Sequence, residues 1–88
     1  MSAFSICLSG VLAERAMKQI DLVRAMCADG NPISFQYVHF LVKGDRIPPP
    51  DLVEKISRAL KLDKQQRMKF HWAAAIDSGY RIGKNGGL

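Results

Sequence analysis

Residues 33–52 read ISFQYVHFLVKGDRIPPPDL, a run of apolar and aromatic side chains that contains one glutamine and one histidine and is closed by three prolines. On a helix with about 3.6 residues per turn, residues 34–43 have two unlike faces. One face is apolar and carries Val38, Leu41 and Val42, with Tyr37 at its edge. The other face carries an amide, an imidazole, an aromatic ring and an ammonium group, at i, i+3, i+4 and i+7: Gln36, His39, Phe40 and Lys43. We expect the first face to pack in a core, which leaves the second for solvent or a partner.

The residues that flank this helix predict its ends. Ser34 is a natural N-cap, because its hydroxyl can accept a hydrogen bond from an N–H group of the first turn. Gly44 suits the left-handed conformation that commonly follows the last helical residue, here Lys43. Residues 47–50 cannot continue the helix, because each proline biases the residue before it toward an extended conformation.

Apolar residues at helical spacing predict four further helices, which cover residues 4–15, 18–28, 50–61 and 64–78. The Asp-Gly-Asn-Pro turn at residues 29–32 separates the second helix from the third. Residues 63–66, Asp-Lys-Gln-Gln, are a variant of the capping box at the start of the last helix, and Gly79 is expected to stop that helix. No segment alternates at period two, so strands are not expected. We therefore predict an all-α, compact five-helix domain in residues 1–82, followed by a flexible tail in residues 83–88.

Composition narrows the classes of partner. The chain has 88 residues, 48% of them hydrophobic, which is enough for one domain with its own core. Its formal net charge of +5 favours an acidic partner, such as nucleic acid, an anionic membrane surface or an acidic protein. No apolar run approaches the roughly 18 residues of a membrane span. The N-terminus also lacks the basic start of a signal peptide, so a cytoplasmic protein is expected.

Neither metal binding nor catalysis is predicted. Cys7 and Cys27 lie among apolar neighbours and are expected to be reduced core thiols. A metal site that joined them to His39 and His71 would need a paired spacing such as Cys-x₂-Cys, which the sequence lacks. No catalytic triad, carboxylate pair or phosphate-binding glycine loop stands out, and His71 is expected at or near the surface. We therefore expect no enzyme, no metal and no cofactor.

The polar face of the helix at residues 34–43 suits the edges of base pairs. Gln36 can make two hydrogen bonds to adenine, and His39 can donate to the acceptors of guanine. The ring of Phe40 can pack on a thymine methyl group, and Lys43 can reach guanine or phosphate. The alternative is an ordinary solvated face, with Phe40 packed on a neighbouring helix.

The order of these features resembles the phage-repressor, or Cro-like (Xre-type), helix-turn-helix family, over residues 12–62. The matching features follow along the chain: Gln19 and Leu22, Ile33-Ser34, Val38 and Leu41, Lys43-Gly44, Arg46 with Pro48 to Pro50, and the amphipathic segment LVEKISRALKL at residues 52–62. Three features depart from the family. Val23 stands where a small residue is usual, and the turn through residues 29–32 is longer by about five residues than the family's turn. Phe40 is an unusually apolar residue at a position that often reaches DNA in such proteins, and a partner-binding patch is the alternative.

The resemblance implies that the helix at residues 34–43 lies in the major groove, while the helix before it crosses the DNA backbone. The side chains then expected at base edges are Phe35, Gln36, His39 and Phe40. Those expected at phosphates are Lys18, Gln19, Ser34, Lys43 and Arg46. Free N–H groups at the start of the helix at residues 18–28 also suit a phosphate oxygen. The resemblance thus implies a sequence-specific double-stranded-DNA-binding transcriptional regulator, which is expected to be cytoplasmic and associated with the nucleoid.

Residues 55–69 contain six basic side chains and a single acidic one, an aspartate. The basic residues are Lys55, Arg58, Lys61, Lys64, Arg67 and Lys69. In the resembled family this region usually faces away from base edges. A solvated face is therefore expected, and a nonspecific phosphate track is the alternative.

The last helix carries two apolar stripes, one at residues 68, 72, 75 and 76 and one at residues 70, 73 and 74. A single stripe is enough to dock a helix on a small domain, so we expect a symmetric partner to cover the second. The alternative is that both stripes pack on the first helix and the short core. The predicted dimer interface is Phe70, Trp72, Ala73 and Ala74, and the homodimer is expected to bind an operator of two half-sites. The rival hypothesis is a protein-interaction module whose Phe35 and Phe40 face docks on a polymerase subunit or a toxin.

Overall fold

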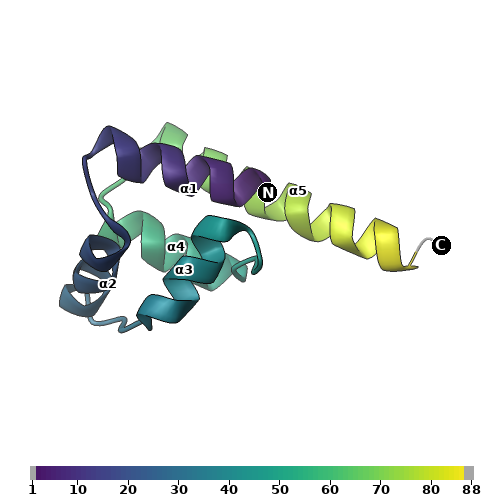
Figure 1. Ribbon diagram of the computed structural model, residues 1–88. Coiled ribbons are helices and arrows are strands. Elements are labelled where there is room, and N and C mark those ends of the chain that lie inside the picture. Colours follow the sequence, from purple (N-terminus) through teal and green to yellow (C-terminus); the bar gives the residue numbers. More distant parts are fainter. Residues whose placement is uncertain (1, 87–88) are drawn as a thin grey trace.

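The computed structural model describes the backbone of residues 2–86 and the side chains of residues 2–79. These residues form a compact all-α structure without strands, as predicted (Figure 1). Its helices are α1 (Ala3–Glu14), α2 (Gln19–Ala28), α3 (Phe35–Lys43), α4 (Pro50–Ala59) and α5 (Lys64–Gly86). α1 runs alongside the first half of α5, α3 packs against α1 and α2, and α4 packs against α5 and α2, while the second half of α5 projects beyond them.

One hydrophobic core joins all five helices. Its largest fully buried side chains come from every helix: Phe4 and Leu8, Leu22 and Met26, Leu41, Ile56, and Phe70. The rings of Phe4 and Phe70 meet edge to face, with centroids 5.3 Å apart and planes inclined by 75°, an arrangement that aromatic pairs favour. This contact fixes α1 on α5, and α3 packs against both α1 and α2.

The N-terminus of α1 is held by a side chain from the opposite end of the chain. Asp77 of α5 is 9% exposed, and its two carboxylate oxygens accept the N–H groups of Ala3 and Phe4, each at 2.9 Å. Ser2 and Ser5 complete the cap with a reciprocal capping box. A carboxylate at the positive end of a helix dipole stabilises the helix, so Asp77 ties α1 to α5.

A glycine follows the end of α2, and another follows the end of α3. Gly30 follows α2 at φ 80°, and Gly44 follows α3 at φ 88°, both in the left-handed region that favours glycine. At each end a pair of backbone hydrogen bonds closes the helix, and Ser34 caps the start of α3 by accepting from the Tyr37 N–H at 3.1 Å. The predicted N-cap and C-terminal glycine of this helix are therefore confirmed.

The predicted stop at Gly79 is wrong, because α5 passes through it and continues to Gly86. A glycine inside a helix costs about 1 kcal/mol relative to alanine, which weakens a helix without ending it. Gly10 lies inside α1 in the same way. The tail predicted for residues 83–88 therefore overlaps the helix as far as Gly86, and residues 87–88 lie outside the described residues.

Candidate nucleic-acid interface

The predicted division of α3 into two faces is confirmed, except that Phe40, predicted on the exposed face, is half-buried. Val38 and Leu41 are fully buried in the core, whereas Gln36, His39 and Lys43 are exposed on the opposite side. The exposed side chains thus project from a helix whose other face is anchored. A rigid helix of this kind can present an amide, an imidazole and an ammonium group to a groove without a change in the fold.

One flank of this face is formed by the start of α2. The Gln19 Oε1 atom lies 3.3 Å from the His39 Nδ1 atom, so the two helices meet through a polar contact at the surface. An amide oxygen can only accept, which places the hydrogen on Nδ1. Gln19, predicted to contact a phosphate, thus lies against His39 in the structure.

The other flank is the turn that follows α3. Arg46 in this turn is exposed, and its guanidinium lies over the ring of Phe40. Phe40 itself is half-buried, so much of its ring is covered within the protein rather than available to a base. Lys43 lies 3.7 Å from Asp45 in a solvent-exposed ion pair, which contributes little to stability.

The start of α2 is less suited to phosphate than the sequence indicated. The carboxylate of Asp21 lies in the first turn and accepts the Lys18 N–H at 2.8 Å. One of the N–H groups expected for phosphate is thus already bonded, and the local negative charge opposes an anion. At this end of α2 the ammonium group of Lys18 is exposed, and the side chain of Gln19 is half-buried.

Phe35 is the most exposed apolar side chain near α3, at 49%. It lines a shallow apolar groove between α1, the start of α2 and α3, together with Leu12, Met17, Ile20 and Val42. Ser34, next to it, is exposed and already caps the helix. Phe35 can therefore reach a thymine methyl group or an apolar protein surface. The groove favours contact with an apolar protein surface.

The predicted dimer interface on α5 requires a correction. Phe70, Ala73 and Ala74 are buried in the core of the single chain, because this stripe is the one that docks α5 on α1. They are not available to a partner. Trp72 does lie at the surface, 67% exposed, and Met68 beside it is 62% exposed.

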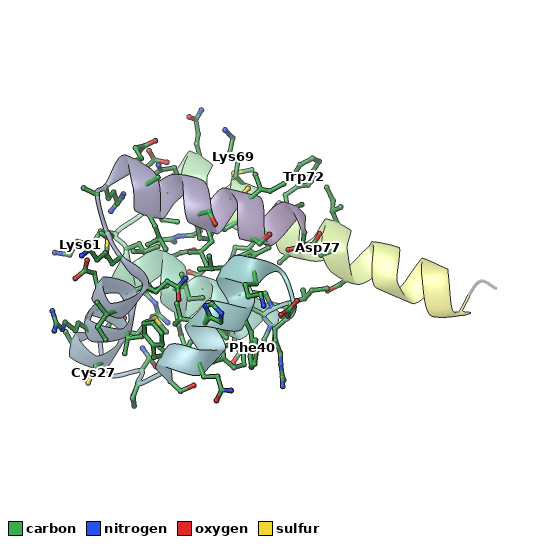
Figure 2. All side chains as sticks on the ribbon, viewed as in Figure 1. Cys27, Phe40, Lys61, Lys69, Trp72 and Asp77 are labelled. Carbon is green, nitrogen blue, oxygen red and sulfur yellow. The ribbon has the colours of Figure 1, made fainter. Side chains whose placement is uncertain are left out.

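The basic residues at positions 55–69 do not gather beside α3. Lys55 pairs with Asp51 at 4.0 Å, and Arg67 pairs with Glu54 at 3.5 Å. Lys69 projects from the α1–α5 side of the molecule, with Phe40 on the opposite side (Figure 2). These charges therefore favour a solvated surface over a continuous phosphate track.

Glu54 joins α4 to α5 through His71, whose Nε2 lies 2.8 Å from the Glu54 Oε1 atom. The hydrogen bond from His71 lowers the pKa of the Glu54 carboxyl below its usual value. Partial desolvation opposes this shift, and the positive charge of Arg67 adds to it. His71 is thus a half-exposed structural residue. No pattern in the sequence predicts its contact with Glu54.

The cysteines differ from the expectation in one respect. Cys7 packs against the core, but Cys27 is exposed at the end of α2 (Figure 2). Both are free thiols. Among the residues with described side chains, no three histidines, cysteines or carboxylates gather as potential metal ligands.

Comparisons with known protein families, with curated proteins and with solved structures found no match to this chain. Within residues 2–86, no helix combines the length and the apolar character that a membrane crossing needs.

Proposed function

We propose that this protein is a sequence-specific double-stranded-DNA-binding transcriptional regulator that places α3 in the major groove. The observation that carries the proposal is the exposed stripe of Gln36, His39 and Lys43 on a helix anchored by the buried Val38 and Leu41. The major groove of B-DNA admits one α-helix, and its base edges present the hydrogen-bonding groups that amide and imidazole side chains read. The resemblance to the phage-repressor helix-turn-helix family supports the same orientation of α3.

The side chains divide into two roles. Gln36, at the N-terminal end of the exposed face, reads adenine through two hydrogen bonds, and His39, which contacts Gln19, reads a neighbouring base. Lys43 at the end of this face, with Lys18 and Arg46 beside it, contacts phosphates, which position the protein without specifying a sequence. The net charge of +5 supports such contacts.

The protein binds as a homodimer to an operator of two half-sites. Support comes from the exposed side chains of Met68 and Trp72 on α5, which no other part of the described chain covers. Large apolar side chains that lie together at a surface commonly mark an interaction site. This surface lies on the α1–α5 side, so a subunit contact there leaves α3 free.

Selection of binding sites from random duplexes, followed by titration of the selected site at several salt concentrations, tests this function. With about four to six phosphates neutralised by each dimer, the logarithm of the binding constant falls with the logarithm of salt at a slope of roughly −4 to −5. Enrichment of a two-part sequence together with this slope supports the proposal. No enriched sequence, or an affinity that does not change with salt, contradicts it.

The second candidate function is a protein-interaction module. It is favoured by the half-exposed ring of Phe35 and the apolar groove beside it. An apolar contact of this kind depends weakly on salt, whereas DNA binding weakens steeply as salt rises. Salt-insensitive binding to a protein partner, lost in Phe35→Ser, distinguishes this function from DNA binding.

A further inference from the structure

The turn after α3 folds back along the helix that it leaves. Gly44 adopts φ 88°, its N–H donates to the Leu41 carbonyl at 3.3 Å, and the Asp45 N–H donates to the Phe40 carbonyl at 2.9 Å. This pair of hydrogen bonds reverses the chain direction at a helix end. Arg46 is therefore returned to the side of α3, instead of extending beyond its last residue.

The guanidinium of Arg46 lies over two rings of α3. Its Cζ atom is 6.0 Å from the ring centroid of Tyr37 and 5.7 Å from that of Phe40. These rings are three residues apart and so lie on neighbouring turns of one helix face. A guanidinium within about 6 Å of an aromatic centroid is attracted by the negative face of the ring. Both rings are half-buried, and Tyr37 packs against the core, so they form a fixed base beneath an exposed arginine.

Arg46 also carries the uncompensated charge of this turn. Lys43 and Asp45 lie within 3.7 Å of each other and largely offset one another. Among residues with described side chains, no carboxylate oxygen lies within 4.0 Å of a guanidinium nitrogen of Arg46. The guanidinium of Arg46 is exposed, rests with one face on aromatic rings and has no carboxylate partner. Its N–H groups therefore stay available to an external anion.

We propose that Tyr37 and Phe40 form an aromatic seat, which holds the Arg46 guanidinium at the edge of α3, and that the seated guanidinium binds a DNA phosphate next to the groove. This inference rests on the proposed function. It makes Tyr37 and Phe40 positioning residues, and it replaces the expected contact of Phe40 with a base. Arginine is required because a planar guanidinium stacks on a ring and binds a phosphate through two N–H groups at once, which a lysine ammonium cannot do.

Titration of a random-sequence duplex with wild type, Arg46→Lys, Phe40→Leu and the double variant tests the seat. Arg46→Lys keeps the charge but should lower the affinity about two- to fivefold, close to the loss in Arg46→Ala. Phe40→Leu should lower it by a similar factor in the wild type and by almost nothing in the Arg46→Lys background. Phe40→Tyr keeps a ring and is the matched control, which should bind like wild type. Wild-type affinity in Arg46→Lys, or an equal loss from Phe40→Leu in both backgrounds, overturns the inference.

A second measurement needs no DNA and separates this inference from the proposed function. In NMR spectra of the free protein, protons of the Arg46 side chain should be shifted upfield by the two rings, and Phe40→Leu should remove part of that shift. Arg46 protons at the positions of an unstructured arginine overturn the seat, whatever the protein binds. A wild type with the upfield shifts but without duplex affinity leaves the seat standing and overturns both its phosphate role and the proposed function.

Discussion

Replacement of Asp77 by alanine should destabilise the protein far more than an ordinary change on a helix surface. The carboxylate is 9% exposed and accepts two N–H groups at the start of α1, those of Ala3 and Phe4, each at 2.9 Å. Phe4 is itself fully buried against Phe70. The substitution therefore leaves two helix N–H groups without acceptors at the edge of the core.

The expected loss follows from these contacts. A hydrogen bond to a charged group contributes about 1.5–3 kcal/mol, and a negative charge at a helix N-terminus adds about 0.3–1 kcal/mol. The two bonds share one carboxylate, and Ser2 still caps the helix, so the contributions do not add in full. We expect Asp77→Ala to lower the free energy of unfolding by about 2–4 kcal/mol, and Asp77→Asn by about half as much.

Urea unfolding followed by helical circular dichroism measures this change. The matched control is Asp45→Ala, because Asp45 is exposed and its single ion pair is with the exposed Lys43. The control should remain within about 0.5 kcal/mol of the wild type. An Asp77→Ala variant that also stays within this limit would refute the assignment of Asp77 as the link between α5 and α1.

Three further predictions concern single residues. Gly10→Ala should raise the free energy of unfolding by about 0.5–1 kcal/mol, because a Cβ there meets no other side chain or helix within 4 Å. Gly30→Ala should lower the free energy of unfolding by about 1–2 kcal/mol, because Gly30 has a φ of 80°. If urea titrations show that both variants change the free energy of unfolding in the same direction, this prediction is contradicted. Trp72→Glu should remain folded but sediment as a monomer, and an unchanged dimer would place the subunit contact elsewhere. Because the pKa of Glu54 is lowered on folding, its stabilising effect is present above its ordinary pKa of 4.5 and is lost as the pH falls through the lowered value. The difference in Tm between wild type and Glu54→Gln should therefore shrink as the pH falls below the lowered pKa of Glu54. A difference in Tm that stays constant with pH would argue against the Glu54–His71 contact.

The parts of the fold that depend on neighbouring residues were predictable from the sequence. Ser34 and Gly44 act on the helix that they flank, so local chemistry located α3 to within one residue. Asp63 and Gln66 exchange the two hydrogen bonds of the predicted cap of α5. The spacing of Val38 and Leu41 identified the buried face of α3, because helical geometry alone places them together.

The parts that depend on distant residues were not predictable in the same way. Both stripes of α5 have helical spacing, and the positions of α1 and α4 decide that Phe70 is buried and Trp72 is exposed. Asp77 caps a helix more than seventy residues away, a pairing that no local pattern encodes. The contacts of His39 with Gln19 and of Arg46 with the rings of α3 likewise arise from the packing of α2 and from the reversal at Gly44.

The most direct test of α3 as the reading helix compares Gln36→Ala and Lys43→Ala on a selected site and on a scrambled duplex of the same length. Both side chains are exposed on one face of α3, so neither change should alter the fold. Gln36→Ala should cost about 1–3 kcal/mol on the selected site and much less on the scrambled duplex, so the ratio of the two affinities falls. Lys43→Ala should weaken both by a similar factor. A ratio of affinities that Gln36→Ala leaves unchanged would contradict the placement of α3 in the major groove.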